Sequence, residues 1–148
     1  MLLYTIGYEG LDQQQFLAHL THNGVDLVAD VRKLPVSRKK GFSKTSLKEM
    51  LNDKNIEYLN FQALGAPKEM RDELYASGDY ERFFKKYQDG LSDKTEPLQI
   101  INELINSGKK VSLLCFERNP GQCHRNVVAE EIQKIDGNGL KVKHIVPL

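Results

Sequence analysis

Residues 25–31 read VDLVADV, a nearly continuous apolar run that is rich in valine. Such a run is typical of a strand that is buried on both faces of a parallel sheet, because helices cover both sides of it. Four other segments have the composition of strands: LLYTI (2–6), IEYL (56–59), VSLLCF (111–116) and KVKHIV (141–146). The last of these alternates between polar and apolar residues, and we expect it to close the sheet at an edge.

Helical patterns separate these strands. Apolar residues recur at helical spacing in residues 11–20, 68–107 and 127–135. A capping-box pattern, Ser46-Leu47-Lys48-Glu49, predicts a further helix that begins at Ser46. The alternation predicts an α/β fold, namely a three-layer α/β/α sandwich with a mainly parallel sheet of about five strands, formed by residues 1–148 as a single domain.

The bulk composition excludes several classes of protein. The chain has 148 residues, of which 40% are hydrophobic and 28% are charged, and its formal net charge is +1. These are ordinary globular values, which argue against disorder and give no global reason to expect nucleic acid or membranes as partners. Neither a signal peptide nor an apolar run of membrane-spanning length is present, so we expect a cytoplasmic protein. Cys115 and Cys123 are too few for a disulfide framework, and we expect thiols in a reducing cytosol.

The positive charge is concentrated in one segment. Residues 32–44, RKLPVSRKKGFSK, hold six basic residues and no acidic residue. This basic segment has two interpretations. It is either a mobile loop that holds phosphates or a nucleic-acid backbone, with Phe42 available to stack on a base, or an ordinary solvated surface loop.

Polar residues and glycines follow four of the predicted strands. They are Gly7, Tyr8 and Glu9 after the first strand, Asp30 and Arg32 at the end of the second, residues 60–67 after the third, and residues 115–125 after the fourth. Ligands of parallel α/β sheets bind beyond the carboxyl ends of the strands, and these ends meet at one edge. The sequence therefore predicts a polar, positively charged cleft at this edge.

The densest group of reactive side chains is CFERNPGQCHR, residues 115–125. If the last helix begins near Cys123, its free N–H groups and its dipole favour a thiolate there, and His124 can carry a proton. The same dipole disfavours Arg125, so we expect a negative partner for it, from protein or ligand. If the protein is an enzyme, the predicted catalytic residues are Cys115, Glu117, Cys123 and His124. The predicted substrate-binding residues are Gly7, Tyr8, Glu9, Asp30, Arg32, Arg38, Arg118 and Arg125.

A purely structural interpretation also fits several of these residues. Asp30 and Arg32 lie on one face of their strand, so an ion pair between them is plausible. Cys115 lies inside a buried strand, where a cysteine is often inert. A zinc site built on the two cysteines, His124 and Glu117 lacks any recognised ligand spacing, so no metal is predicted, and the sequence indicates no particular cofactor.

Several separated motifs together resemble a known family. TIGYEG (5–10), DVRKLPVSR (30–38), LGAP (64–67) and LLCFERNPGQCHR (113–125) resemble, in this order, the prokaryotic family catalogued as domain of unknown function 488. The resemblance extends to the HIV at 144–146. One departure is Tyr8-Glu9, where many members carry histidine and serine, so residue 8 either takes part in chemistry or only stacks. The resemblance supports the prediction of these site residues and implies no particular reaction.

Three functions remain open on these grounds. The first is an enzyme that acts on an anionic, phosphate-bearing substrate, such as a nucleotide or a nucleic-acid end. The second is a non-catalytic nucleic-acid-binding module that uses the basic segment. The third is a redox-responsive anion-binding protein in which Cys115 and Cys123 form a reversible disulfide. The sequence does not distinguish between oligomeric states.

Overall fold

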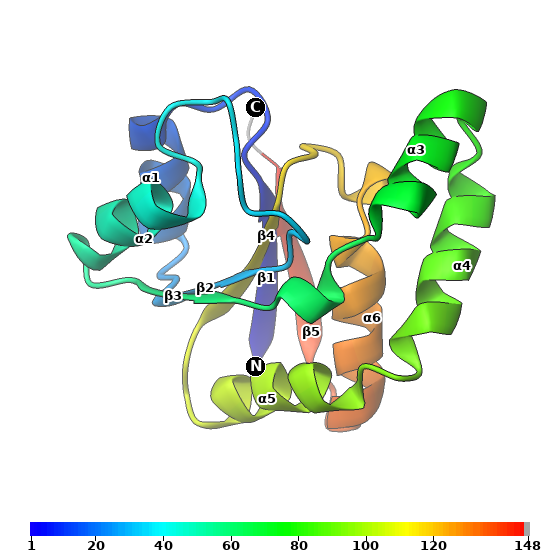
Figure 1. The fold of residues 1–148 in the computed structure, drawn as a ribbon. Helices are drawn as coiled ribbons and strands as arrows, with labels where there is room; N and C mark the ends of the chain where they lie inside the picture. Colours follow the sequence, from blue (N-terminus) through cyan, green and yellow to red (C-terminus); the bar gives the residue numbers. More distant parts are fainter. Residues whose placement is uncertain (147–148) are drawn as a thin grey trace.

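The computed structural model describes residues 1–146, which contain a parallel sheet of five strands (Figure 1). The strands are β1 (Leu2–Gly7), β2 (Leu27–Asp30), β3 (Glu57–Asn60), β4 (Val111–Cys115) and β5 (Lys141–Ile145). They lie in the order β3-β2-β4-β1-β5, and every neighbouring pair is parallel. The predicted parallel sheet is confirmed, and β5 lies at an edge of it. All five carboxyl ends consequently meet at one side of the sheet.

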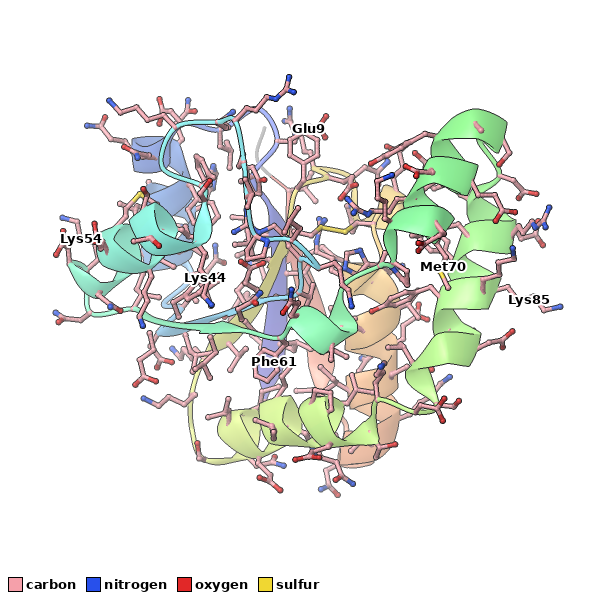
Figure 2. All side chains as sticks on the ribbon, in the orientation of Figure 1. Glu9, Lys44, Lys54, Phe61, Met70 and Lys85 are labelled. Carbon is pink, nitrogen blue, oxygen red and sulfur yellow. A yellow bond between two sulfur atoms is a disulfide. The ribbon has the colours of Figure 1, made fainter. Side chains whose placement is uncertain are left out.

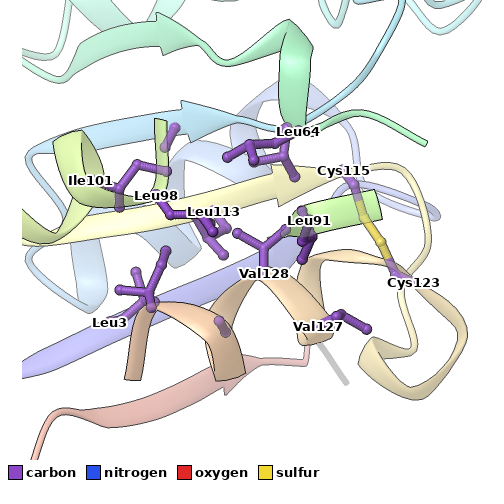
Figure 3. Packing of buried hydrophobic residues seen from close by; sticks show 14 of the residues in the cluster. Leu3, Leu64, Leu91, Leu98, Ile101, Leu113, Cys115, Cys123, Val127 and Val128 are labelled. Atoms are coloured by element: carbon purple, nitrogen blue, oxygen red, sulfur yellow. A yellow bond between two sulfur atoms is a disulfide. The ribbon is translucent and has the colours of Figure 1, made fainter. Parts of the chain in front are cut away.

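Two helical layers cover the sheet (Figure 1). On one face lie α1 (Gln13–His22) and α2 (Lys44–Asn52), and their side chains pack with Val28 of β2. On the other face lie α5 (Thr95–Asn106) and α6 (Arg125–Asp136), which pack with Leu27 and Ala29 of β2. Figure 3 shows this second cluster around Leu113 of β4. Successive residues of β2 thus face different layers, which explains the continuous apolar run of this strand and confirms the three-layer sandwich.

A helical hairpin extends the second layer at the carboxyl edge of the sheet. It consists of α3 (Lys68–Ser77) and α4 (Tyr80–Leu91), and it follows a short 3-10 turn, η1 (Gln62–Leu64). Leu74, Phe83 and Tyr87 bury their side chains in the cluster that also holds α5 and α6. Lys85 points outward from α4, whereas Met70 of α3 packs partly buried against the cluster (Figure 2). The hairpin is therefore part of the core, although it lies outside the sandwich.

The ends of some helices follow local signals. Asp12 and Gln15 form a capping box at the start of α1, and Gly137 ends α6 in the left-handed conformation. The prediction that Ser46 begins a helix is wrong, because α2 begins at Lys44. The Lys44 N–H bonds to the Pro35 carbonyl, so the chain already turns there. Within residues 1–146, no helix has the length and apolar character needed to cross a membrane.

Candidate anion-binding cleft

A cleft of about 300 Å³ lies at the carboxyl ends of the strands. Its walls come from the segment after β2, from α3 and from the loop after β4. Figure 1 shows the segment after β2, in cyan, and α3, in green, on opposite sides of this edge. Segments that are distant in the sequence therefore place their side chains around one cavity.

Asp30 and Arg32 form a buried ion pair at the end of β2. The fully buried Asp30 carboxylate accepts hydrogen bonds from Arg32 Nε at 2.9 Å and Arg32 Nη2 at 2.7 Å, and from the Tyr58 hydroxyl at 2.5 Å. Burial opposes the charge of Arg32, but the hydrogen bond and charge of Asp30 outweigh it and raise the pKa of Arg32. Most N–H donors of the Arg32 guanidinium therefore already have acceptors within the protein, although Arg32 also borders the cleft.

The same arginine anchors the basic segment, residues 32–44. Arg32 Nη1 donates to the carbonyl oxygen of Phe42 at 2.6 Å. The Phe42 ring is fully buried, stacks on Tyr8 with ring centroids 4.6 Å apart, and meets Phe16 edge-on. The prediction that Phe42 is available to stack on a base is wrong, because this apolar ring fills the space between Tyr8 and α1. Tyr8 itself is buried, stacks, and accepts a hydrogen bond from Arg32 at 3.3 Å.

Three other cations line the cleft. Lys33 and Arg38 extend from the basic segment with exposed side chains, and Arg71 lies half-buried on α3. Among the described residues, none of these three has a carboxylate within 4 Å. The Arg71 Nε is buried and has no hydrogen-bond partner in this part of the chain. Arg71 therefore keeps donor capacity for an anion in the cleft.

Arg71 was not among the residues predicted from the sequence. It lies on a helix rather than directly after a strand, and only the packing of the α3–α4 hairpin brings it to the edge of the sheet. One local signal was available. Arg71 lies near the start of α3, where the helix dipole disfavours a cation, which is the argument that singled out Arg125.

Cys115 and Cys123 are joined by a disulfide in the wall of the cleft (Figure 3). The expectation of two thiols is therefore not met in this structure. The bond connects the last residue of β4 to the residue before His124, the N-cap of α6, because the intervening loop brings the chain back to the end of β4. Both cysteines are almost completely buried. In the disulfide form neither sulfur is a thiolate nucleophile.

The Glu117 carboxyl group lies beside this disulfide and lines the cleft. Its Oε2 is 3.5 Å from Cys115 Sγ. Burial raises the pKa of Glu117 above its ordinary value. Cys115, Glu117 and Cys123 bring their potential ligand atoms within 4.8 Å of one another. Because the sulfurs are bonded to each other, they offer no thiolates to a metal ion in this form.

Arg125 is a fully buried cation behind the wall of the cleft. Its Nη1 donates to the Glu117 carbonyl oxygen at 2.5 Å and lies 3.1 Å from Cys115 Sγ, and its Nη2 donates to the Arg118 carbonyl oxygen at 3.2 Å. Burial lowers the pKa of Arg125 to about 10. Among residues 1–146, no carboxylate lies within 4 Å of it and its Nε has no hydrogen-bond partner. Within this part of the chain the expected negative partner is therefore not a directly paired carboxylate, although the charge of Glu117 still acts on Arg125.

His124 is buried and connects α6 to β2. Its Nε2 lies 2.8 Å from the Val31 carbonyl oxygen, so this nitrogen carries the proton and donates it. Its Nδ1 lies 3.8 Å from Cys123 Sγ, and its ring packs edge-on against Tyr87. Burial lowers the pKa of His124 to about 4, so the imidazole is neutral at neutral pH.

This low pKa makes stability depend on pH. In the unfolded chain His124 takes up its proton near its ordinary pKa, above the folded value of about 4, so acid favours unfolding. We expect the free energy of unfolding to fall by about 3 kcal/mol from this residue as the pH drops from neutral to about 4. Urea titrations across this range measure it. His124→Gln should flatten the dependence.

Five residues predicted to bind substrate lie outside the lining of the cleft, namely Gly7, Glu9, Asp30, Arg118 and Arg125. Gly7 packs so closely against the loop after β4 that a Cβ there would overlap the Glu117 carbonyl oxygen. Glu9 is exposed at the carboxyl edge (Figure 2) and accepts a hydrogen bond from the Arg118 N–H at 3.0 Å. Glu9 and Arg118 border a separate depression with Asn119 and Pro120. The structure therefore brings Tyr8, Arg32, Arg38, Cys115, Glu117, Cys123 and His124 together around the cleft.

The parallel sheet and its two helical layers define a three-layer α/β protein with a polar cleft at the carboxyl edge of the sheet. The chain belongs to the family described as Domain of unknown function DUF488, whose model matches residues 12–132. The match confirms the family that the sequence resembles, although TIGYEG (5–10) and the HIV at 144–146 lie outside the matched residues. No curated protein and no solved structure gave a significant match in the other two comparisons.

Proposed function

We propose that this protein is an enzyme that binds an anionic, phosphate-bearing substrate, such as a nucleotide or a nucleic-acid end, in the cleft at the strand carboxyl ends. The observation that carries the proposal is the unsatisfied hydrogen-bond donor of Arg71 in the cleft. Its buried Nε has no protein partner in the described chain, and the neighbouring Lys33 and Arg38 have no carboxylate partner there. A buried donor without a partner is costly, and a phosphate oxygen would satisfy it.

The rim of the cleft supports a substrate with an apolar or aromatic part. Leu34, Val36, Tyr75 and Phe116 all line the cleft, and between 45% and 70% of each side chain is exposed. Flat aromatic surface beside cations is the combination that binds a base and its phosphate. We therefore favour a nucleotide or nucleic-acid end over a simple sugar phosphate.

The chemistry in this proposal is assigned to a few side chains. Arg38 and Arg71 neutralise the anion, and Glu117, whose pKa is raised by burial, transfers a proton at the reacting bond. His124 is neutral, and its Nε2 is occupied by the Val31 carbonyl oxygen, so it acts as a positioning residue. A cysteine nucleophile requires prior reduction of the disulfide.

Arg71→Met tests the proposal. Ligand binding to the folded state raises the melting temperature, so we expect shifts with a nucleoside monophosphate and, more weakly, with inorganic phosphate. The variant should bind about tenfold or more weakly, because it loses a charge-assisted hydrogen bond. Arg82→Met is the matched control, because Arg82 lies on α4 and pairs with Glu73 outside the cleft. Equal binding by the wild type and Arg71→Met would exclude this site.

The second candidate is a nucleic-acid-binding module, and the exposed Arg38, Lys40 and Lys44 of the basic segment favour it. Binding to a short oligonucleotide would then weaken steeply with salt, and substitutions in this segment would reduce the salt dependence. An affinity that does not change with salt would reject this candidate. In either case the proposed location is the cytoplasm, and the proposed partner is an anionic small molecule or a nucleic acid.

A further inference from the structure

We propose that the Cys115–Cys123 disulfide is a redox-active pair that opens by exchange with a small thiol and leaves Cys115 as a thiolate paired with Arg125. This inference goes beyond the proposed function and does not depend on it. It concerns the wall of the cleft rather than the anion that the cleft holds.

The surroundings of Arg125 favour a negative charge on Cys115. This guanidinium is fully buried, and in the described chain its partners are two carbonyl oxygens and the sulfur of Cys115, at 3.1 Å. A buried charge without a counter-ion is costly. The disulfide supplies no charge, whereas a Cys115 thiolate would place a full negative charge beside the guanidinium. The reduced form therefore gains a stabilising pair that the oxidised form lacks.

Stabilising the thiolate affects both the equilibrium and the rate of reduction. A disulfide whose reduced form is stabilised is the stronger oxidant, and a thiol of lower pKa is the better leaving group in thiol–disulfide exchange. Cys115 should therefore be the leaving sulfur. Both cysteines are almost completely buried but line the cleft, so a small thiol would have to approach the bond from within the cleft.

The exchange with the small thiol proceeds in two steps. The thiolate of a small thiol attacks Cys123 Sγ, the Cys115–Cys123 bond breaks, and Cys115 departs with the electron pair as a thiolate beside Arg125. A second small thiol attacks the mixed disulfide, releases Cys123, and gives up its proton to the Cys123 sulfur. The small thiols are thereby oxidised to their own disulfide while the protein gains two electrons and one proton.

The residues around Cys123 suit the neutral member of the pair. His124 Nδ1 lies 3.8 Å from Cys123 Sγ and is unprotonated, so it can accept a hydrogen bond from a Cys123 thiol. The Arg125 backbone N–H lies 3.5 Å from this sulfur and would favour a Cys123 thiolate, but it carries no full charge, whereas Cys115 Sγ lies 3.1 Å from the guanidinium itself. Beside Cys115, the Glu117 carboxyl lies 3.5 Å from the sulfur, and in its protonated form it can donate to the thiolate.

Counting thiols in glutathione buffers tests the equilibrium. The oxidised protein is incubated at a series of ratios of reduced to oxidised glutathione, quenched with an alkylating reagent and weighed by mass spectrometry. We expect the wild type to convert between disulfide and dithiol within this series. Arg125→Met should shift the equilibrium constant towards the disulfide by about tenfold or more, since it removes the charge that stabilises the thiolate. Arg125→Lys should restore part of the difference, and Arg82→Met should match the wild type.

A titration of single thiols tests which sulfur carries the charge, and it does not require Arg125 to be replaced. In Cys123→Ser, the thiolate absorbance of Cys115 should appear well below the ordinary thiol pKa of about 8.5. In Cys115→Ser, Cys123 should titrate clearly higher than Cys115 does. A Cys115 pKa at or above the ordinary value, or a disulfide that resists every glutathione ratio, would overturn the proposal. No phosphate ligand is present in either experiment, so the result is independent of the proposed function.

Discussion

Asp30→Asn is expected to lower the free energy of unfolding by about 3–5 kcal/mol. The substitution keeps the shape of the side chain and removes its charge, which leaves Arg32 buried without a counter-ion. It also weakens the hydrogen bond from the Tyr58 hydroxyl, whose length is 2.5 Å. Chemical denaturation of both proteins at neutral pH measures the difference.

The effect of Asp30→Asn should depend on Arg32. The double variant Asp30→Asn/Arg32→Met removes the buried cation as well, so it should be more stable than the two separate losses predict. Asp26→Asn is the matched control, because Asp26 only accepts a hydrogen bond from the Lys110 N–H in a more exposed position. Simple additivity in the double variant would show that the ion pair does not carry the effect.

Gly7→Ala is expected to destabilise the fold by about 3 kcal/mol, at the upper end of the range for overpacked sites. The added Cβ would overlap the carbonyl oxygen of Glu117, which belongs to the backbone and cannot rotate away. The loop after β4 would have to move, and the neighbouring hydrogen bonds from Tyr8 and Glu9 to the Cys115 and Phe116 carbonyls would be disturbed. Thermal and urea unfolding report the loss.

Gly90→Ala provides the control for Gly7→Ala. Gly90 lies within α4, and nothing lies within 4 Å of a Cβ placed there. Alanine favours the helix over glycine by up to about 1 kcal/mol, so this variant should be equally stable or slightly more stable. If Gly7→Ala behaved like Gly90→Ala, the close approach of Gly7 to the loop after β4 would not matter for stability.

Much of the fold could be predicted from the sequence because the burial of a strand determines its pattern of apolar residues. β2 contacts a different helical layer on each face, so its residues are apolar almost without interruption. β5 lies at an edge, and its alternating pattern predicts this position. The start of α2 was predicted two residues too late, because the Lys44–Pro35 hydrogen bond that turns the chain is not visible in a capping pattern.

The site was harder to predict because it depends on tertiary packing. The strand ends pointed to the correct edge of the sheet, since parallel strands bring their carboxyl ends together. Arg71 reaches this edge only through the packing of a helical hairpin, and Phe42 is withdrawn from it by stacking on Tyr8. The disulfide depends on where the loop after β4 returns, and the positions of Cys115 and Cys123 in the sequence do not determine that return.

An anion bound between the cations of the cleft would connect two parts of the molecule. Arg38 belongs to a segment that is anchored by Phe42 to the core beneath α1 and α2, whereas Arg71 belongs to a hairpin that is anchored to the core beneath α5 and α6. The sheet separates these two cores. An anion held between Arg38 and Arg71 would span both and act as a brace across the open end of the sandwich. Binding of the anion would then make both sides of the molecule more rigid.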